Sequence, residues 1–515
     1  MKKTFYIFSW KGIHKWVGVL LSVFILLFCI SGIILNHRKL FSDCSVDRRL
    51  MPAAYSIKSF NNAIIKGTLP LDEDRIIAYG YAGAWLTDRN FSNAEDFNSG
   101  LPEGVDGRNI RNIVRTRDGR IWCAAQYGIY TLTDRQWVEI PLDGNNERVT
   151  DIALTPDSCN VVAMTRSAIY TQSEDGTFNR HEIPAPDNRN DRITLFKSLW
   201  MLHSGELFGT VGRVIVDIIA LIIAFLCLTG IVLLILPYSI RKSAKKQRNK
   251  EVKKKASSMK WNLRWHNHIG FTTLALTILI AFTGMCLRPP MMIPAVLIKT
   301  RPLPGSTLDN PNAWHDRLRG LRWDDECNCW LLSTSDGFFS IDRRFTGRPQ
   351  SIPASQTPPV SPMGITVFEK ENTGTWLIGS FSGIYRWNPA TGSVIDYLSG
   401  QPYCPSQRRS FAGGNLVSGY SADFDTSAPV VFDYSSGTSL LSEMPVILSR
   451  QPISLWNFAL ELHVGRCYTP FLGPLSGLFV FLSGSLLIII LISGLIIRSR
   501  YKRKQRKNTI LINQL

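Results

Sequence analysis

Histidine is the residue type whose positions in this sequence most suggest chemistry. The chain has eight histidines, and five of them stand just before a long apolar segment: His14, His203, His266, His268 and His463. A neutral imidazole is a common metal ligand, and haem iron takes one axial imidazole from each side of its ring. Pairs of such histidines on facing helices would therefore be suited to hold haem.

The residues around four of these histidines are duplicated. Two histidines open one pattern, with a Gly four positions later and a Ser/Thr-Gly pair at seventeen and eighteen: His14, Gly18 and Ser31-Gly32, then His266, Gly270 and Thr283-Gly284. Two others open a looser pattern, in which His-x-Gly leads to an apolar run that ends in Ser/Thr-Gly: His203, Gly205 and Thr229-Gly230, then His463, Gly465 and Ser493-Gly494. One histidine at a membrane interface needs no further explanation, but four at matched positions favour ligands. The glycines after His14 and His266 would leave space for a porphyrin edge.

The apolar segments predict the elements that position these histidines. Each has about the 20 residues that a membrane-spanning helix needs: Trp16–Leu35, Val214–Leu236, Ile269–Leu287 and Leu475–Ile497. The predicted fold is a membrane α-helical bundle of four transmembrane helices, built as a duplicated two-helix unit, with two extracytoplasmic all-β inserts. Its parts are a flank and first span (1–37), an insert (38–199), an outer histidine segment and second span (200–237), a basic loop (238–262), a third span (263–288), a second insert (289–455), an outer histidine segment and fourth span (456–497), and a basic tail (498–515).

The net charge of +18 is concentrated beside the spans. Nine Lys/Arg lie between Arg241 and Lys255, and seven between Arg498 and Lys507. The positive-inside rule then predicts that both termini and the loop between spans two and three are cytoplasmic. These basic runs are expected to contact anionic membrane lipid rather than nucleic acid.

The inserts repeat a β-hairpin pattern at intervals of 40–46 residues. Five segments show an apolar residue, five further residues, a small residue and an aromatic two positions on: Ile77–Trp85, Trp122–Tyr130, Val162–Tyr170, Leu331–Phe339 and Leu377–Tyr385. Repeats of this length predict propeller blades or half-blades. Two or three units per insert are too few to close a ring, so either the inserts combine into one β structure, which we favour, or each is an open sandwich.

The repeat symmetry favours one histidine pair on each side of the membrane. His14 would pair with His266 near the cytoplasm and His203 with His463 outside, although pairing between adjacent helices stays open. His203 and His463 precede their apolar segments by eleven and twelve residues, so a bend at the intervening glycines would be needed to bring them back to the bundle. Arg213 would hold a haem propionate or form a local ion pair with Asp217.

The histidine, glycine and Ser/Thr-Gly patterns, with Gly212-Arg213, resemble the PepSY-associated transmembrane family of iron-regulated membrane proteins. The resemblance covers the four membrane segments and implies two b-type haems and electron transfer through the bacterial inner membrane to ferric siderophores in the periplasm. The sequence departs from the family in its inserts, which show blade-like repeats where compact PepSY domains are usual.

The expected function is therefore electron transfer by a haem-containing membrane protein. Its expected activity is the reduction of ferric chelates. No Rossmann, P-loop or flavin signature is present, so a quinol or a cytoplasmic reductase would be the external donor, and a ferric chelate or a partner protein would meet the β inserts. One alternative is a haem-free membrane sensor or assembly module whose inserts bind a ligand or partner. Another is a transporter component, which the few charges at membrane depth disfavour.

Overall fold

A computed structural model describes residues 9–142, 147–173, 175–187, 191–359, 364–404, 416–441 and 443–512, with only the backbone for 504–512. The chain forms two compact units. A helical unit comprises 1–38, 191–309 and 456–515, and a β unit comprises 39–190 and 310–455. The two inserts thus combine into one unit, and each is somewhat shorter than its predicted range.

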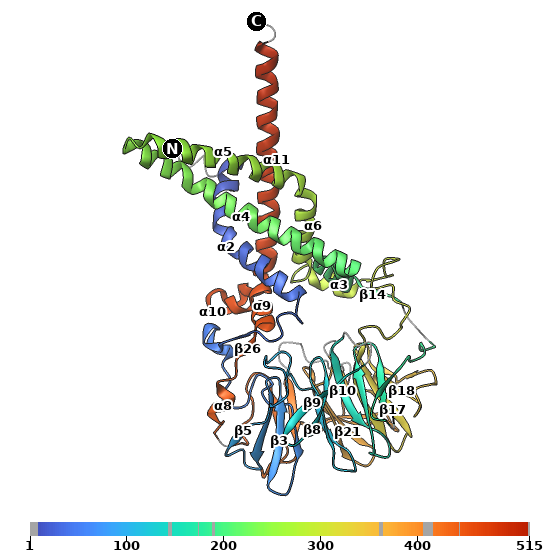
Figure 1. The fold of residues 1–515 in the computed structure, drawn as a ribbon. Coiled ribbons are helices and arrows are strands. Elements are labelled where there is room, and N and C mark those ends of the chain that lie inside the picture. Colours follow the sequence, from blue (N-terminus) through green and yellow to red (C-terminus); the bar gives the residue numbers. More distant parts are fainter. Residues whose placement is uncertain are drawn as a thin grey trace. The chain divides into compact units, whose positions relative to one another are not determined.

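The helical unit contains the predicted apolar segments (Figure 1). Its α-helices are α2 (Trp10–Asn36), α3 (Leu195–Ser204), α4 (Gly209–Lys245), α5 (Asn249–Thr272), α6 (Leu274–Cys286), α7 (Met292–Leu297), α9 (Leu455–His463), α10 (Thr469–Leu472) and α11 (Phe479–Ile512). Short 3-10 turns, η3 (Glu206–Phe208), η6 (Arg466–Tyr468) and η7 (Gly473–Leu478), and the strands β14 (Ile193–Thr194) and β15 (Lys299–Thr300) complete it. Residues 191–199 and 289–309 belong to this unit, in which β14 pairs with β15. The prediction had placed both ranges in the inserts.

Three segments of the described chain are helices long and apolar enough to cross a membrane: Trp10–Asn36, Glu206–Lys245 and Arg466–Arg503. The predicted third span is not one straight helix. It is divided at Thr273 into α5 and α6, which differ in direction by 66°. A membrane protein with three such helices, or four if the bent pair is one span, is what the structure supports.

The helices pack around a small apolar core. Leu21, Ile25 and Cys29 of α2 meet Ile219 and Ile223 of α4. α11 contacts α2 and α6, α5 lies along α4, and α3 lies against α6 (Figure 1). The buried hydroxyls of Ser22, Ser31 and Thr229 donate to carbonyls of their own helices, which offsets the cost of burying them.

The β unit is built from antiparallel sheets. Five have four strands, in chain order: β2 (Gly67–Pro70) to β5 (Ala94–Asp96), β6 (Asn112–Arg115) to β9 (Gln136–Ile140), β10 (Val149–Leu154) to β13 (Phe178–His181), β16 (Leu318–Asp324) to β19 (Gln350–Ser351), and β20 (Val367–Asn372) to β23 (Ser393–Asp396). Their inner strands are β3 (Arg75–Gly80), β4 (Gly83–Asp88), β7 (Ile121–Ala124), β8 (Ile129–Thr133), β11 (Val161–Thr165), β12 (Ile169–Gln172), β17 (Cys329–Thr334), β18 (Phe338–Ile341), β21 (Thr375–Ser380) and β22 (Gly383–Asn388). Two-stranded sheets pair β24 (Val417–Ser421) with β25 (Val430–Asp433) and β1 (Ser45–Val46) with β26 (Ile453–Ser454). Short helices η1 (Arg48–Leu50), η2 (Ala53–Tyr55), η4 (Ala354–Gln356) and α8 (Val446–Ser449) lie between strands.

All five predicted hairpins are present. Each is formed by the second and third strands of a four-stranded sheet. The β24–β25 sheet was missed because its strands are joined by a long connection and lack the hairpin motif.

Successive sheets contact one another through their first strands. β2 contacts β6, β6 contacts β10, β10 contacts β16, and β24 contacts both β20 and β2. Leu331 and Phe338 pack with Phe368 and Trp376, which joins the fourth sheet to the fifth. The series of contacts therefore returns to the sheet with which it began.

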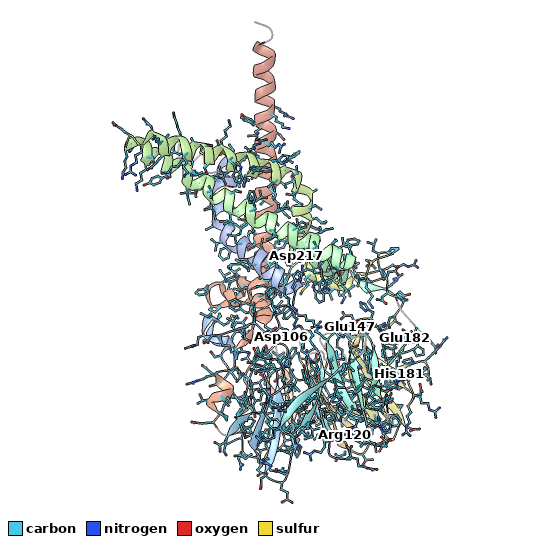
Figure 2. The ribbon with its side chains drawn as sticks, viewed as in Figure 1. Asp106, Arg120, Glu147, His181, Glu182 and Asp217 are labelled. Carbon is cyan, nitrogen blue, oxygen red and sulfur yellow. The ribbon has the colours of Figure 1, made fainter. Side chains whose placement is uncertain are left out.

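The segment that opens a sheet hydrogen-bonds the hairpin turn of the sheet before it. Ile110 donates to Gly80, Val149 to Gln126 and Leu318 to Arg166, backbone to backbone. We call the end of the sheets where these bonds lie the hairpin end. Figure 2 shows Asp106 and Glu147 near this end of the sheets and Arg120, in the turn after β6, at the opposite one.

Candidate functional site: two histidine pairs

Each of the four duplicated histidines rests on a Ser/Thr-Gly pair of another helix. We call each such pair, with the carbonyl three residues before its Ser or Thr, a seat. His14 sits on Ser493-Gly494 of α11, His203 on Thr283-Gly284 of α6, His266 on Thr229-Gly230 of α4, and His463 on Ser31-Gly32 of α2. The Nδ1-to-hydroxyl distances are 3.0, 3.2, 2.9 and 2.9 Å in that order. The two repeated motifs of the sequence, the histidine and the Ser/Thr-Gly pair, thus contact each other in the structure.

The seats fix which ring nitrogen carries hydrogen. Nδ1 of His14 lies 3.0 Å from the carbonyl oxygen of Ile490, and Nδ1 of His203 lies 3.1 Å from that of Ile280. A carbonyl oxygen only accepts, so in both rings Nδ1 is the N–H donor.

The same tautomer holds in the other two rings. The Thr229 hydroxyl donates to the Phe225 carbonyl at 2.8 Å, and the Ser31 hydroxyl donates to the Leu27 carbonyl at 2.6 Å. Each oxygen is then an acceptor for the histidine Nδ1–H of His266 or His463. Every one of the four Nε2 atoms therefore carries a lone pair and is suited to ligate a metal.

The glycine of each seat gives the imidazole room. A Cβ atom placed on Gly284 would lie 2.7 Å from Cε1 of His203, and one on Gly494 would lie 3.2 Å from Cε1 of His14. The corresponding distances are 3.4 Å at Gly32 and 3.7 Å at Gly230. A side chain is excluded at Gly284, whereas Gly230 has room for a methyl group.

Every histidine crosses to the other half of the duplication. His14 and His203 belong to the first half and sit on α11 and α6 of the second, while His266 and His463 sit on α4 and α2 of the first. The seats therefore interlock the two halves.

The rings come together in two pairs, as the repeat symmetry predicted. The ring centroids of His14 and His266 are 6.1 Å apart, and those of His203 and His463 are 6.2 Å apart. Within the described part of the chain, all hydrogen bonds of these rings are made by Nδ1.

These distances fit two imidazoles on one metal ion. A metal–imidazole bond is about 2 Å long and the ring centroid lies roughly 1 Å behind the nitrogen, so two axial rings have centroids roughly 6 Å apart. An Nδ1–H held by a hydroxyl or a carbonyl is the usual outer support of a metal-ligating histidine. The residues present therefore fit a bis-histidine haem at each pair.

The outer histidines reach the bundle through turns at glycine. α3 ends at Gly205, whose φ is 78°, and α9 is followed by Gly465, whose φ is 80°. Both backbones are in the left-handed region that glycine adopts without strain. The chain reverses at these points, so His203 and His463 lie against the spans rather than beyond their ends.

The charges near the outer end of α4 have other partners than the sequence suggested. Arg213 forms an ion pair with Glu206 at 2.9 Å, and Asp217, labelled in Figure 2, accepts from His37 at 2.7 Å and from Asn36 at 3.2 Å. The i,i+4 pairing of Arg213 with Asp217 is therefore not the arrangement found. The link between His37 and Asp217 could not be seen from spacing alone.

Gly18 and Gly270, which were predicted to leave space for a porphyrin edge, each lie near an aliphatic side chain of another helix. Gly18 lies beside Ile490, and Gly270 lies beside Leu226. These side chains belong to the helices that seat His14 and His266. The glycines allow close helix packing at the seats, which is a common use of small residues in membrane helices.

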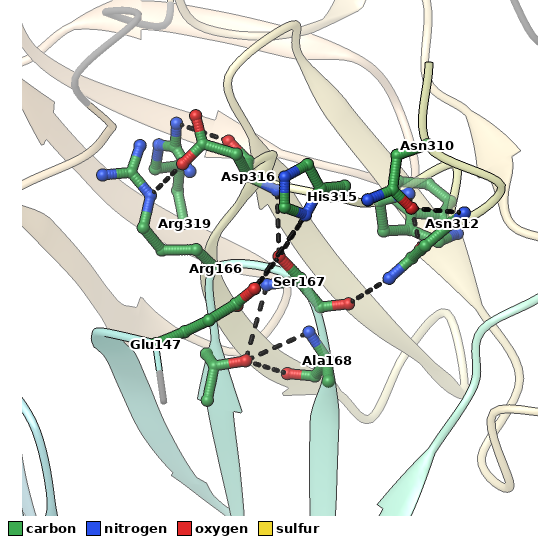
Figure 3. Close-up of polar contacts among 11 residues, drawn as sticks. Glu147, Arg166, Ser167, Ala168, Asn310, Asn312, His315, Asp316 and Arg319 are labelled. Carbon is green, nitrogen blue, oxygen red and sulfur yellow. Dashed lines mark hydrogen bonds and ion pairs between the residues drawn. The ribbon is translucent and has the colours of Figure 1, made fainter. Parts of the chain in front are cut away.

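The remaining histidines lie outside the pairs. His268 packs edge-on to Trp265, and His181 bonds the Thr171 hydroxyl in the β unit. His315 bonds Ser167, whose hydroxyl also donates to Glu147 at 2.8 Å (Figure 3). This contact joins the first insert to the second.

Residues 4–236 and 187–362 match the PepSY-associated TM region, which is well over half of the chain. The chain belongs to this family. This PepSY-associated TM protein matches no curated protein.

Two solved structures show low similarity to the chain. The extracellular domain of a one-component system from Bacteroides thetaiotaomicron has a TM-score of 0.35 and 12% identity, over 73% of this chain and 32% of that one. A protein of unknown function from the same organism has a TM-score of 0.35 and 9% identity, over 75% of this chain and 72% of that one. The PepSY-associated TM protein spans about a third of the first of these chains.

Proposed function

We propose that this protein is a membrane electron-transfer protein that holds two haem b groups, one between His14 and His266 and one between His203 and His463. The observation that carries the proposal is the set of four interlocked seats, which leave four bare Nε2 atoms in two pairs with centroids 6.1 and 6.2 Å apart. Isolated interface histidines have no need of such matched support.

The protein's own residues would set the geometry of these sites. The hydroxyls and carbonyls of the seats hold each ring in one tautomer and one orientation, and the apolar core of α2 and α4 excludes water. Bound haem would supply one-electron chemistry. Arg213 keeps its Nε without a partner among the described residues, which supports a role for it in holding a propionate.

We further propose four membrane crossings, with the bent α5–α6 pair as one of them. The basic residues after α4 and at the end of α11 support cytoplasmic termini and a cytoplasmic α4–α5 connection in a bacterial inner membrane. The β unit would then be periplasmic. Its ring of contacts supports a six-bladed propeller whose last blade has two described strands.

The electron acceptor would be a ferric chelate, and the donor would be a quinol or a cytoplasmic reductase. Ferric-siderophore reductases are members of the family, which supports an iron chelate as substrate. The β unit, where the family usually places PepSY domains, would bind the chelate or a partner protein.

The test is a haem determination followed by a reoxidation assay. We expect the pyridine haemochrome of purified protein to give about two haem b per chain, and ferric siderophores to reoxidise the reduced protein faster than buffer does. Absence of haem after haem-replete expression would contradict the proposal and favour a haem-free sensor or assembly module. If the protein contains haem but no ferric chelate reoxidises its reduced form, the proposed substrate would be rejected and the haem sites would stand.

A further inference from the structure

Basic residues gather at the hairpin end of the β unit. Lys66 precedes β2, Arg111 precedes β6, Arg148 precedes β10, and Arg319 lies at the start of β16. These are the first strands of four successive sheets, and they contact one another in that order. The four cations therefore follow one another around the same end of the sheets.

Lys66 has only neutral partners. Its Nζ donates to the Asn109 side-chain oxygen and, at 3.0 Å, to the Ile110 carbonyl. No carboxylate pairs with it among the described residues. Burial lowers the pKa of Lys66 well below its usual value, and the positive charge of Arg111 lowers it further. The charged form of Lys66 is thus disfavoured in the folded protein, because the amine is buried beside Arg111 and has no carboxylate partner among the described residues.

Arg148 and Arg319 form a second like-charged neighbourhood. The Arg319 guanidinium donates to the carbonyls of Leu318 and Asp316, both at 2.9 Å. Its pKa is lowered mainly by burial and also by the charge of Arg148, although Asp316 and Asp336 act in the opposite direction.

The acidic residues at this end are already engaged. Asp316 pairs with Arg166 at 2.6 Å, and Asp336 pairs with Arg317 at 2.7 Å. Glu147 accepts from Ser167, as Figure 3 shows, and Asp106 accepts from Tyr127 at 3.2 Å. Asp316 and Asp336 are therefore engaged by other arginines, and no carboxylate pairs with Lys66 among the described residues.

Gln126 adds a hydrogen-bond donor that has no acceptor. Its side chain is fully buried, and its Oε1 accepts from Arg111. Its backbone carbonyl accepts from Val149, the residue after Arg148, so it lies between the two groups of cations. Its Nε2 has no partner among the described residues. A buried amide N–H without an acceptor costs free energy, and an oxygen from an anion would remove that cost.

We propose that the hairpin end of the β unit binds a small anion with carboxylate or phosphate oxygens, held by Lys66, Arg111 and the Gln126 amide, with Arg148 and Arg319 adding positive charge. Charge-assisted hydrogen bonds from ammonium and guanidinium groups are strong and suit such oxygens. The site uses no residue of the histidine pairs, so it does not depend on the proposed haem.

The experiment measures thermal unfolding of the full-length protein in detergent by tryptophan fluorescence, with citrate or inorganic phosphate added at constant ionic strength and chloride as reference. We expect a saturable rise of the midpoint with at least one of the two anions, and the stronger one identifies the oxygen chemistry. Lys66→Met should weaken the apparent affinity at least tenfold, whereas Lys58→Met, a change of an exposed lysine in the same unit, should leave it as in the wild type.

Gln126→Glu provides a second variant that does not remove a cation. A carboxylate at this position supplies the missing negative charge, so the variant should unfold at a higher midpoint without added anion and should respond less to citrate or phosphate. No response of the wild type to either anion, or equal responses of Lys66→Met and Lys58→Met, would overturn the site. So would a Gln126→Glu protein that gains no stability and keeps the full anion response.

Discussion

At the scale of single residues, the seats explain why histidine, Ser/Thr and glycine recur together. The hydroxyl and the carbonyl three residues earlier fix Nδ1–H, and the glycine leaves space for the ring. The sequence revealed both motifs as repeat markers. It could not reveal that they contact each other, because His203 and Thr283 are 80 positions apart and spacing within a helix carries no information about its neighbour.

Thr283→Val should weaken haem binding at the outer pair. Loss of the hydroxyl removes an Nδ1 partner of His203, and changes of this kind lower metal affinity about tenfold or more. Haem titration of the apoprotein measures the effect. Thr277→Val is the matched control, because Thr277 is also buried in α6 but bonds only its own helix. Equal affinities of the two variants would argue against the seat.

Alanine substitutions at the seat glycines should reduce haem content most where the space beside the imidazole is smallest. Gly284→Ala places a methyl group 2.7 Å from His203 and should displace the ring, whereas Gly230→Ala meets His266 only at 3.7 Å, an ordinary contact. We expect Gly284→Ala to lose most of the haem of one pair and Gly230→Ala to keep nearly the full content, as measured by pyridine haemochrome. The reverse order would be inconsistent with the seats.

At the scale of elements, the apolar segments and hairpins were predictable because each is defined by local pattern. The break at Thr273 was not predictable, because the run from Ile269 to Leu287 contains neither a charged residue nor a proline. The reversal after α3 was expected from its glycines, and the positive φ of Gly205 explains it. The sheet of β24 and β25 lacked a hairpin signal altogether.

Gly205→Ala should disrupt the reversal that carries His203 to α6. A Cβ atom there would lie 2.2 Å from the Gly212 carbonyl oxygen, in a backbone conformation that alanine adopts poorly. We expect a lower thermal midpoint and loss of the outer haem, with the inner one retained. Gly477→Ala, where a Cβ atom would meet nothing within 4 Å, should behave as the wild type. Similar loss in both variants would show that the turn is not specific.

At the scale of the whole molecule, each half of the duplication depends on the other. The histidines cross between halves. The β unit draws three four-stranded sheets from the first insert and two from the second, and β1 of the first pairs with β26 of the second. The sequence has only two or three hairpin units in each insert, too few to close a ring. This number favoured one combined β unit, which the structure has. A buried ion pair that joins them, Asp151 of β10 with Arg322 of β16 at 2.7 Å, had no sequence signal.

Asp151→Ala should destabilise the joined β unit. Removing one partner of a buried ion pair typically costs about 3–5 kcal/mol, and here it leaves Arg322 without the carboxylate that it hydrogen-bonds, although Glu369 stays near it. Urea unfolding followed by tryptophan fluorescence measures this cost. Asp187→Ala removes an exposed pair with Arg348 that also joins the inserts, and it should cost about 1 kcal/mol or less. A cost for Asp151→Ala no larger than that of the control would refute this account of the joint.

The pairing of histidines across the two halves is the central claim, and haem content in double variants tests it most directly. If His14 and His266 share one haem, the single variants to alanine and the His14/His266 double variant should each lose the same half of the haem, while a His14/His203 double variant should lose all of it. Complete loss in the His14/His266 double variant with partial loss in both single variants, or no haem in the wild type, would contradict the account.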